Sequence, residues 1–126
     1  MNTKLTAWVT IASLLMYIWV FANVGKARGV HKVAAPSTDG PLEFLVALRV
    51  QANTVEQLVL FLPLLWLCCL YLNDRTAAVL GATWVVGRVI YALGYYKAPA
   101  KRSMGFGISS MAALGLLIGA IVGLVS

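Results

Sequence analysis

Two groups of polar side chains lie within stretches that are otherwise apolar. Their members are spaced three or four residues apart, and they are Arg49, Asn53 and Glu56 in one stretch and Arg88, Tyr91 and Tyr95 in the next. On a helix that turns about 100° per residue, this spacing places each group on one face. Arginine forks, an amide, a carboxylate and phenols together suit a zwitterionic ligand that carries several carboxylates. The sequence therefore predicts a polar pocket where the two helical faces meet.

A structural interpretation of the same residues is a buried ion pair. Counted from the turn between the two stretches, Glu56 lies about 24 Å along one helix and Arg88 about 18 Å along the other, at 1.5 Å per residue. The two side chains could compensate each other's desolvation and simply hold the helices in register. An ion pair alone does not explain why Gln51, Asn53 and Tyr91 gather at the same end, so both interpretations stay open at this point.

The composition indicates an integral membrane protein. Hydrophobic residues make up 61% of the 126 residues and charged residues 11%, and the mean hydropathy is +0.87. Four stretches are long enough to cross about 30 Å of hydrocarbon, namely residues 5–24, 53–72, 76–96 and 103–125. The first is too long for the apolar part of a signal peptide and is not followed by a small-residue cleavage site, so we expect it to be retained.

The net charge of +6 does not indicate a nucleic-acid partner, because the cations lie beside the apolar stretches. They concentrate in two of the connections, as Lys26, Arg28, Lys32, Lys97, Lys101 and Arg102. The positive-inside rule then places both connections in the cytoplasm and both termini on the other side. The compact connections favour a bacterial inner membrane.

The expected architecture is one all-α integral membrane domain of residues 1–126, a four-helix up-and-down transmembrane bundle. Its helices are expected at residues 5–24, 42–72, 76–96 and 103–125. A minimal turn at residues 73–75 makes the second and third helices antiparallel neighbours. Residues 25–41 contain several glycines and prolines and are expected to be irregular. Pro63 is expected to kink the second helix.

Small residues and cysteines in the apolar stretches have structural interpretations. A glycine recurs at every fourth position of the last stretch, at Gly115, Gly119 and Gly123. This flat stripe suits either packing within the chain or contact between subunits. The adjacent Cys68 and Cys69 do not match metal-ligand spacing and are interpreted as packing residues. His31 has no further ligand at suitable spacing, so no metal site is expected.

Arg102 follows the third stretch, at the end predicted to be cytoplasmic. One interpretation is a membrane-surface residue that contacts lipid headgroups. The other is a cation that stabilises an anion at the mouth of the pocket. A thiolate is an anion that needs such help, because a thiol with a pKa near 8.5 is only about 3% ionised at pH 7.

The two polar groups resemble the signature of the MAPEG family, the membrane-associated proteins in eicosanoid and glutathione metabolism. The stretch from Arg49 to Glu56 reads R-V-Q-A-N-T-V-E, similar to the family's R-x-Q-x-N-x-x-E. The next helix supplies Arg88, Tyr91, Gly94 and Tyr95, as in R-x-x-Y-x-x-G-Y, and the segment FLP at residues 61–63 lies between the motifs. The resemblance extends over residues 26–103.

This resemblance implies a homotrimer of four-helix subunits that binds glutathione in a cleft between neighbouring subunits, near the cytoplasmic side. By similarity, the glutathione-binding residues are Arg28, Arg49, Gln51, Asn53, Glu56, Arg88, Tyr91 and Tyr95. Arg102 occupies the position of the arginine that stabilises the glutathione thiolate, and Ser103 after it is assigned to the substrate. The implied activity is a glutathione transferase, in which the thiolate attacks a hydrophobic electrophile that arrives through the bilayer.

Two departures from the leukotriene C synthase branch restrict what the resemblance implies. Gln57 stands where that branch has a tyrosine, and Gly29 stands where it has a second arginine. The substrate preferences of the eicosanoid enzymes are therefore not carried over, and we expect a general glutathione transferase with hydroperoxide reduction as a side activity.

Two other functions are alternatives. The first is a non-catalytic, lipid-binding member of the same family, like the lipoxygenase-activating protein; Arg102 and the intact helix motif count against it. The second is a small multidrug transporter. Those transporters place their working glutamate in the first helix, whereas residues 5–24 of this chain are uncharged.

Overall fold

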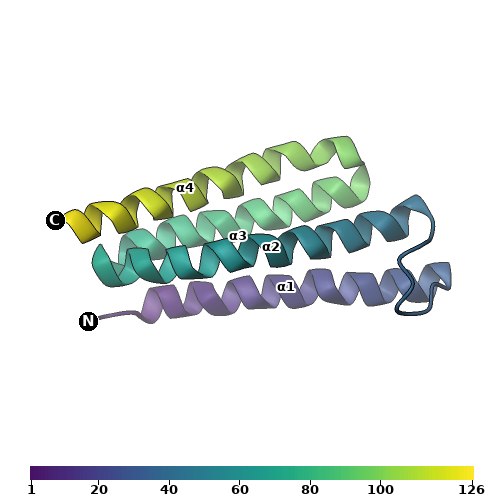
Figure 1. Ribbon diagram of the computed structural model, residues 1–126, viewed down its shortest axis with the longest axis horizontal. Helices are drawn as coiled ribbons and strands as arrows, with labels where there is room; N and C mark the ends of the chain where they lie inside the picture. Colours follow the sequence, from purple (N-terminus) through teal and green to yellow (C-terminus); the bar gives the residue numbers. More distant parts are fainter.

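The computed structural model describes all residues 1–126, which form four long helices (Figure 1). These are α1 (Lys4–His31), α2 (Leu42–Tyr71), α3 (Asp74–Lys97) and α4 (Ser103–Val125), and a short 3-10 helix, η1 (Pro99–Arg102), precedes α4. The helices lie alongside one another with both termini at the same end (Figure 1). All four are long and apolar enough to cross a membrane. The predicted all-α membrane bundle is therefore confirmed.

The first connection is shorter than the sequence suggested. The prediction of irregular structure from residue 25 onward was wrong, because α1 continues to His31 and the connection begins only at Lys32. A Cβ atom at Gly25 or Gly29 would meet nothing within 4 Å, so these glycines mark no turn or close contact. The helix ends where Lys32 adopts a left-handed conformation with φ 54°.

The turn between α2 and α3 is even shorter than the predicted residues 73–75, because α2 ends at Tyr71 and α3 already begins at Asp74. The side chain of Asn73 accepts a hydrogen bond of 2.7 Å from the backbone N–H of Thr76 and so caps α3. Helix α2 remains helical through Pro63. In the core between the two helices, the rings of Phe61 and Trp84 stack with centroids 3.8 Å apart. This stacked pair joins α2 and α3 about one helical turn from Glu56 and Arg88.

The start of α1 is capped by a residue that is distant in the sequence. The carboxylate of Asp74, at the start of α3, accepts hydrogen bonds from the backbone N–H groups of Thr6 at 2.8 Å and Leu5 at 3.1 Å. The residue before α1, Thr3, makes no side-chain cap of its own. Because the first N–H groups of a helix have no partner within it, Asp74 satisfies two of them and ties α1 to α3.

The glycine stripe of α4 packs within the chain. A Cβ atom on Gly119 would lie 3.0 Å from Cys68 Sγ, and one on Gly115 would lie 3.2 Å from Leu80. Gly123 approaches the backbone of Tyr71 even more closely. Of the two interpretations of the stripe, packing within the chain is therefore the one that these contacts support. Cys68 is buried, as expected of a packing residue.

Candidate binding site

The two predicted polar faces meet around one cavity of about 360 Å³, here called the polar cavity. Its lining residues are Arg49, Ala52, Asn53 and Glu56 from α2, Tyr91 and Tyr95 from α3, and Arg102 from η1. Since η1 joins α3 to α4, the polar cavity lies toward the end of the bundle opposite to both termini (Figure 1). Six residues singled out from the sequence thus line the same space.

The side chains around the polar cavity differ in their burial. Arg49 and Glu56 are exposed on the surface of the chain and Asn53 is half-buried, whereas Tyr91 is almost fully buried. The rings of Tyr91 and Tyr95 meet edge to face with centroids 5.6 Å apart. Tyr91 therefore forms a buried wall of the polar cavity, and Arg49 and Glu56 lie at its exposed side.

Arg102 reaches the polar cavity because α3 and α4 approach each other very closely here. A Cβ atom on Gly105 would overlap the backbone of Tyr91, and one on Gly94 would overlap the carbonyl of Lys101. This contact brings the guanidinium carbon of Arg102 to 5.4 Å from the centroid of the Tyr95 ring. Arg102 also donates from Nη1 to the carbonyl of Pro99 at 2.6 Å, so its remaining N–H groups are free for a ligand.

Ser103, the residue assigned to the substrate, lines an adjoining depression rather than the polar cavity itself. That depression shares Asn53, Tyr91 and Arg102 with the polar cavity, and Phe106 and Gly107 complete it. The shared residues make the two spaces neighbours. A ligand in the polar cavity would therefore lie next to the depression that Ser103 lines.

The structure places Arg88, which was predicted to bind the ligand, behind the polar cavity and not in its lining. Its side chain has no exposed surface, and it does not line the polar cavity. Its Nη2 atom donates to Asn53 Oδ1 at 2.7 Å and to Thr54 Oγ1 at 3.1 Å. The alternative ion pair with Glu56 does not form either, because Arg88 points into the contact between α2 and α3 while Glu56 faces outward.

Arg28 and Gln51 also lie outside the polar cavity of the same chain. Arg28 donates from Nη1 to the carbonyl of Ser37 at 2.8 Å, and Gln51 donates from Nε2 to the hydroxyl of Tyr17 in α1 at 2.8 Å. The reason is helical geometry: two residues after Arg49, Gln51 is turned by about 200° and faces α1. Within one chain, Arg28 and Gln51 therefore do not surround the cavity.

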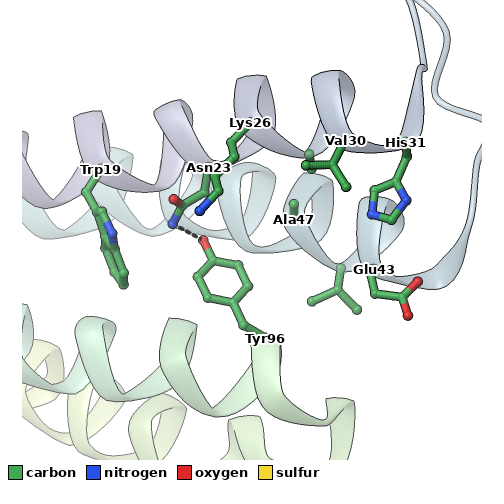
Figure 2. A pocket seen from close by; sticks show the side chains of 10 residues that line it. Trp19, Asn23, Lys26, Val30, His31, Glu43, Ala47 and Tyr96 are labelled. Carbon is green, nitrogen blue, oxygen red and sulfur yellow. Dashed lines mark hydrogen bonds between the residues drawn. The ribbon is translucent and has the colours of Figure 1, made fainter.

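A second cavity, of about 350 Å³, lies between α1, the start of α2 and the end of α3. Figure 2 shows Asn23 and Tyr96 pointing toward each other across it, joined by a hydrogen bond of 3.1 Å from Asn23 Nδ2 to the Tyr96 hydroxyl. Tyr95 and Tyr96 are neighbours in the sequence, yet they line different cavities. Asn23, an amide in an apolar stretch, is the sequence signal that could have indicated this space.

Comparisons with known proteins agree with the two motifs. The MAPEG family model matches residues 6–122. The chain is 44% identical over 116 residues to an uncharacterized protein of Synechocystis sp., which covers 92% of this chain and 85% of that protein. It is 38% identical over 121 residues to microsomal glutathione S-transferase 2 of Homo sapiens, and this match covers 95% of this chain and 82% of that protein. It is 34% identical over 125 residues to leukotriene C4 synthase of Cavia porcellus, and this match covers 99% of this chain and 83% of that protein.

Proposed function

Because the chain belongs to the MAPEG family, we propose that it is a membrane-bound glutathione transferase whose polar cavity holds glutathione. The observation that carries this proposal is the gathering of Arg49, Asn53, Glu56, Tyr91, Tyr95 and Arg102 around one cavity. Relatives named for glutathione transfer and for leukotriene C4 synthesis support it. A family member that only presents lipid would have no need of this set of charged groups.

The charges of the site complement those of glutathione. Arg49 and Arg102 line the polar cavity, Arg88 is buried directly behind Asn53, and Glu56 is the one carboxylate in the lining. Three cations and one anion leave a net charge of two positive units. Glutathione in its thiolate form has two carboxylates, one thiolate and one ammonium group, which leaves two negative units. Glu56 suits the ammonium group, and the arginines suit the anions.

Arg102 is proposed as the catalytic residue that keeps the thiol ionised. Lowering the pKa of a thiol by about two units requires roughly 2.7 kcal/mol of preferential stabilisation of the thiolate. A guanidinium with free N–H groups at the edge of the polar cavity can supply much of this by donating charge-assisted hydrogen bonds to the thiolate.

The chemistry then follows from the thiolate. Its sulfur attacks an electrophilic carbon, a carbon–sulfur bond forms, and a leaving group such as chloride departs with the bonding electrons. With a hydroperoxide, the sulfur attacks the terminal oxygen, the oxygen–oxygen bond breaks, and the alkoxide leaves and takes a proton from water to become the alcohol. Glutathione sulfenic acid remains. A second glutathione then converts the sulfenic acid to a disulfide and water. The hydrophobic partner enters from the bilayer near Ser103, while glutathione enters from water.

We also propose that the chain works as a homotrimer in a bacterial inner membrane, with the polar cavity on the cytoplasmic side. Arg49 and Glu56 are exposed on the isolated chain, and charged side chains near hydrocarbon need polar surroundings. A neighbouring subunit that covers this side would bring its own Arg28 and Gln51 toward the cavity. The basic residues around the same end of the bundle favour the cytoplasmic orientation.

Conjugation of glutathione to a small chloronitroarene tests the proposed activity. We expect purified protein to catalyse it, and Arg102→Ala to lower turnover by about 100-fold, in line with the loss of a group that stabilises a developing or bound anion. The ultraviolet absorption of the bound thiolate should disappear in the same variant. Lys101→Ala is the matched control, because Lys101 is an adjacent cation that does not line the polar cavity. Glutathione binding without turnover that depends on Arg102 would instead favour the non-catalytic alternative.

A further inference from the structure

Arg88 is a buried cation without a carboxylate partner. None of its surface is exposed, and its Nε and Nη1 atoms have no hydrogen-bond partner in the chain. Its guanidinium carbon lies 4.1 Å from the centroid of the Tyr91 ring, and its Nη2 atom donates to Asn53 and Thr54. An ionised group in such a place is costly unless something compensates it. Its position therefore calls for a functional explanation.

The contact with Asn53 determines how that amide is turned. A guanidinium has only donors, so the atom of Asn53 that faces Arg88 must be the oxygen, Oδ1. The amide nitrogen, Nδ2, donates no hydrogen bond within the chain, and Asn53 lines the polar cavity, so Nδ2 is the donor that Asn53 offers to a ligand there. Whatever occupies the cavity meets a hydrogen-bond donor at position 53.

We infer that Arg88 is a positioning residue that sets the ligand preference of position 53. This inference deepens the proposed function, because it assigns a carboxylate or carbonyl oxygen of glutathione to Asn53 and excludes its ammonium group from that place. The ammonium group is left for Glu56, one helical turn further along α2. The hydrogen bond from Arg88 also polarises the amide, which strengthens the donor that faces the ligand.

The effect of Arg88 on a ligand must be indirect. Because the side chain is fully enclosed by its own chain, neither glutathione nor a neighbouring subunit can contact it. Asn53 and Tyr91 both contact Arg88 and line the polar cavity. A variant at position 88 should therefore act through these two residues, and its influence on binding should depend on whether Asn53 is present.

A double-mutant cycle on glutathione affinity tests this dependence. We expect Arg88→Gln and Asn53→Ala each to raise the Kd for glutathione by about tenfold, and the double variant to bind no more weakly than Asn53→Ala alone. The kcat of Arg88→Gln for conjugation should change little, because Arg102 and not Arg88 stabilises the thiolate. The matched control is Thr54→Val, which removes the other hydrogen-bond partner of Arg88 but no cavity atom. The inference would be overturned if the two increases in Kd multiplied in the double variant. It would also be overturned if Thr54→Val weakened glutathione binding as much as Arg88→Gln does.

A second variant remains informative if Arg88→Gln fails to fold, and its stability is measured without ligand. Asn53→Asp places a carboxylate against the buried cation, so we expect its melting temperature to equal or exceed that of the unmodified protein while its Kd for glutathione rises at least tenfold. Asn53→Ala should instead lower the melting temperature. A lower melting temperature in Asn53→Asp, or undiminished glutathione affinity, would overturn the inference. If the unmodified protein binds no glutathione, the proposed function fails, but the stability comparison still tests the contact between Arg88 and Asn53.

Discussion

Arg88 Nη2 donates a hydrogen bond of 2.7 Å to Asn53 Oδ1, although the two residues are 35 positions apart in the sequence. The bond joins the polar faces of α2 and α3 behind the cavity that both faces line. Arg88 itself has no exposed surface. The site therefore has two layers, an outer one that lines the cavity and an inner one, Arg88, behind it.

Glu56→Gln should weaken the binding of glutathione by about tenfold, because Glu56 is the one carboxylate that lines the polar cavity and charge-assisted hydrogen bonds contribute roughly 1.5–3 kcal/mol. Equilibrium binding to the purified protein measures the change. An analogue of glutathione that lacks the ammonium group should bind both proteins equally. Glu43→Gln is the control, since Glu43 is an exposed carboxylate at the start of the same helix and lies outside the polar cavity. Equal weakening with the analogue would argue against a contact between Glu56 and the ammonium group.

Gly105→Ala should lower both stability and conjugation. The added Cβ would overlap the backbone of Tyr91, so α4 must move away from α3 at an overpacking cost of about 1–3 kcal/mol. Because Arg102 directly precedes α4, its position beside Tyr95 should change as well. Thermal unfolding and turnover of the chloronitroarene measure the two effects.

The matched control for Gly105→Ala is Gly25→Ala. A Cβ atom at Gly25 meets nothing within 4 Å, so alanine there should leave turnover unchanged and stabilise α1 by up to about 1 kcal/mol through its higher helix propensity. If the two glycine variants behaved alike, close packing of α3 against α4 would not be what positions Arg102.

Asp74→Ala should destabilise the protein by about 1–2 kcal/mol, the usual effect of losing a helix cap. The carboxylate of Asp74 holds the N–H groups of Leu5 and Thr6, and α1 would lose this contact with α3. Because Asp74 lies at the end of the bundle away from the polar cavity, glutathione affinity should not change. Asp39→Ala, in the exposed first connection, should leave the melting temperature unaltered. A coupled loss of affinity in Asp74→Ala would show that the two ends of the bundle are not independent.

Subunit mixing should reveal whether a neighbouring chain completes the site. Gln51 is turned away from the polar cavity of its own chain, so in the proposed homotrimer it serves the cavity of a neighbour. Arg49→Ala and Gln51→Ala should each lower conjugation when expressed alone. Co-expression of the two variants should recover part of the turnover, because some interfaces then combine an intact Arg49 with an intact Gln51. No recovery in mixed oligomers would indicate that both residues act within one chain.

Much of the candidate site could be predicted because its residues follow a local rule. Arg49, Asn53 and Glu56 share a face by helical spacing alone, and they line the same cavity as Tyr91 and Tyr95. Helical spacing could not show that Arg88 and Tyr91 have different surroundings. Both lie on one broad face of α3, yet Arg88 points into the contact between α2 and α3 whereas Tyr91 reaches the cavity. The extent of α1 was missed for a similar reason: glycine weakens a helix but does not end it unless the backbone turns.

The four-helix membrane bundle and the polar faces on two neighbouring helices can be predicted from the sequence, because hydropathy and helical periodicity depend only on residues close together in the chain. The contact of Arg88 with Asn53, the cap that Asp74 forms on α1, and the close packing at Gly105 that lets Arg102 approach Tyr95 are visible only in the folded bundle. Each of these relationships depends on the depth and rotation at which one helix meets another. Packing over the whole bundle sets those two quantities, and no short stretch of sequence records them.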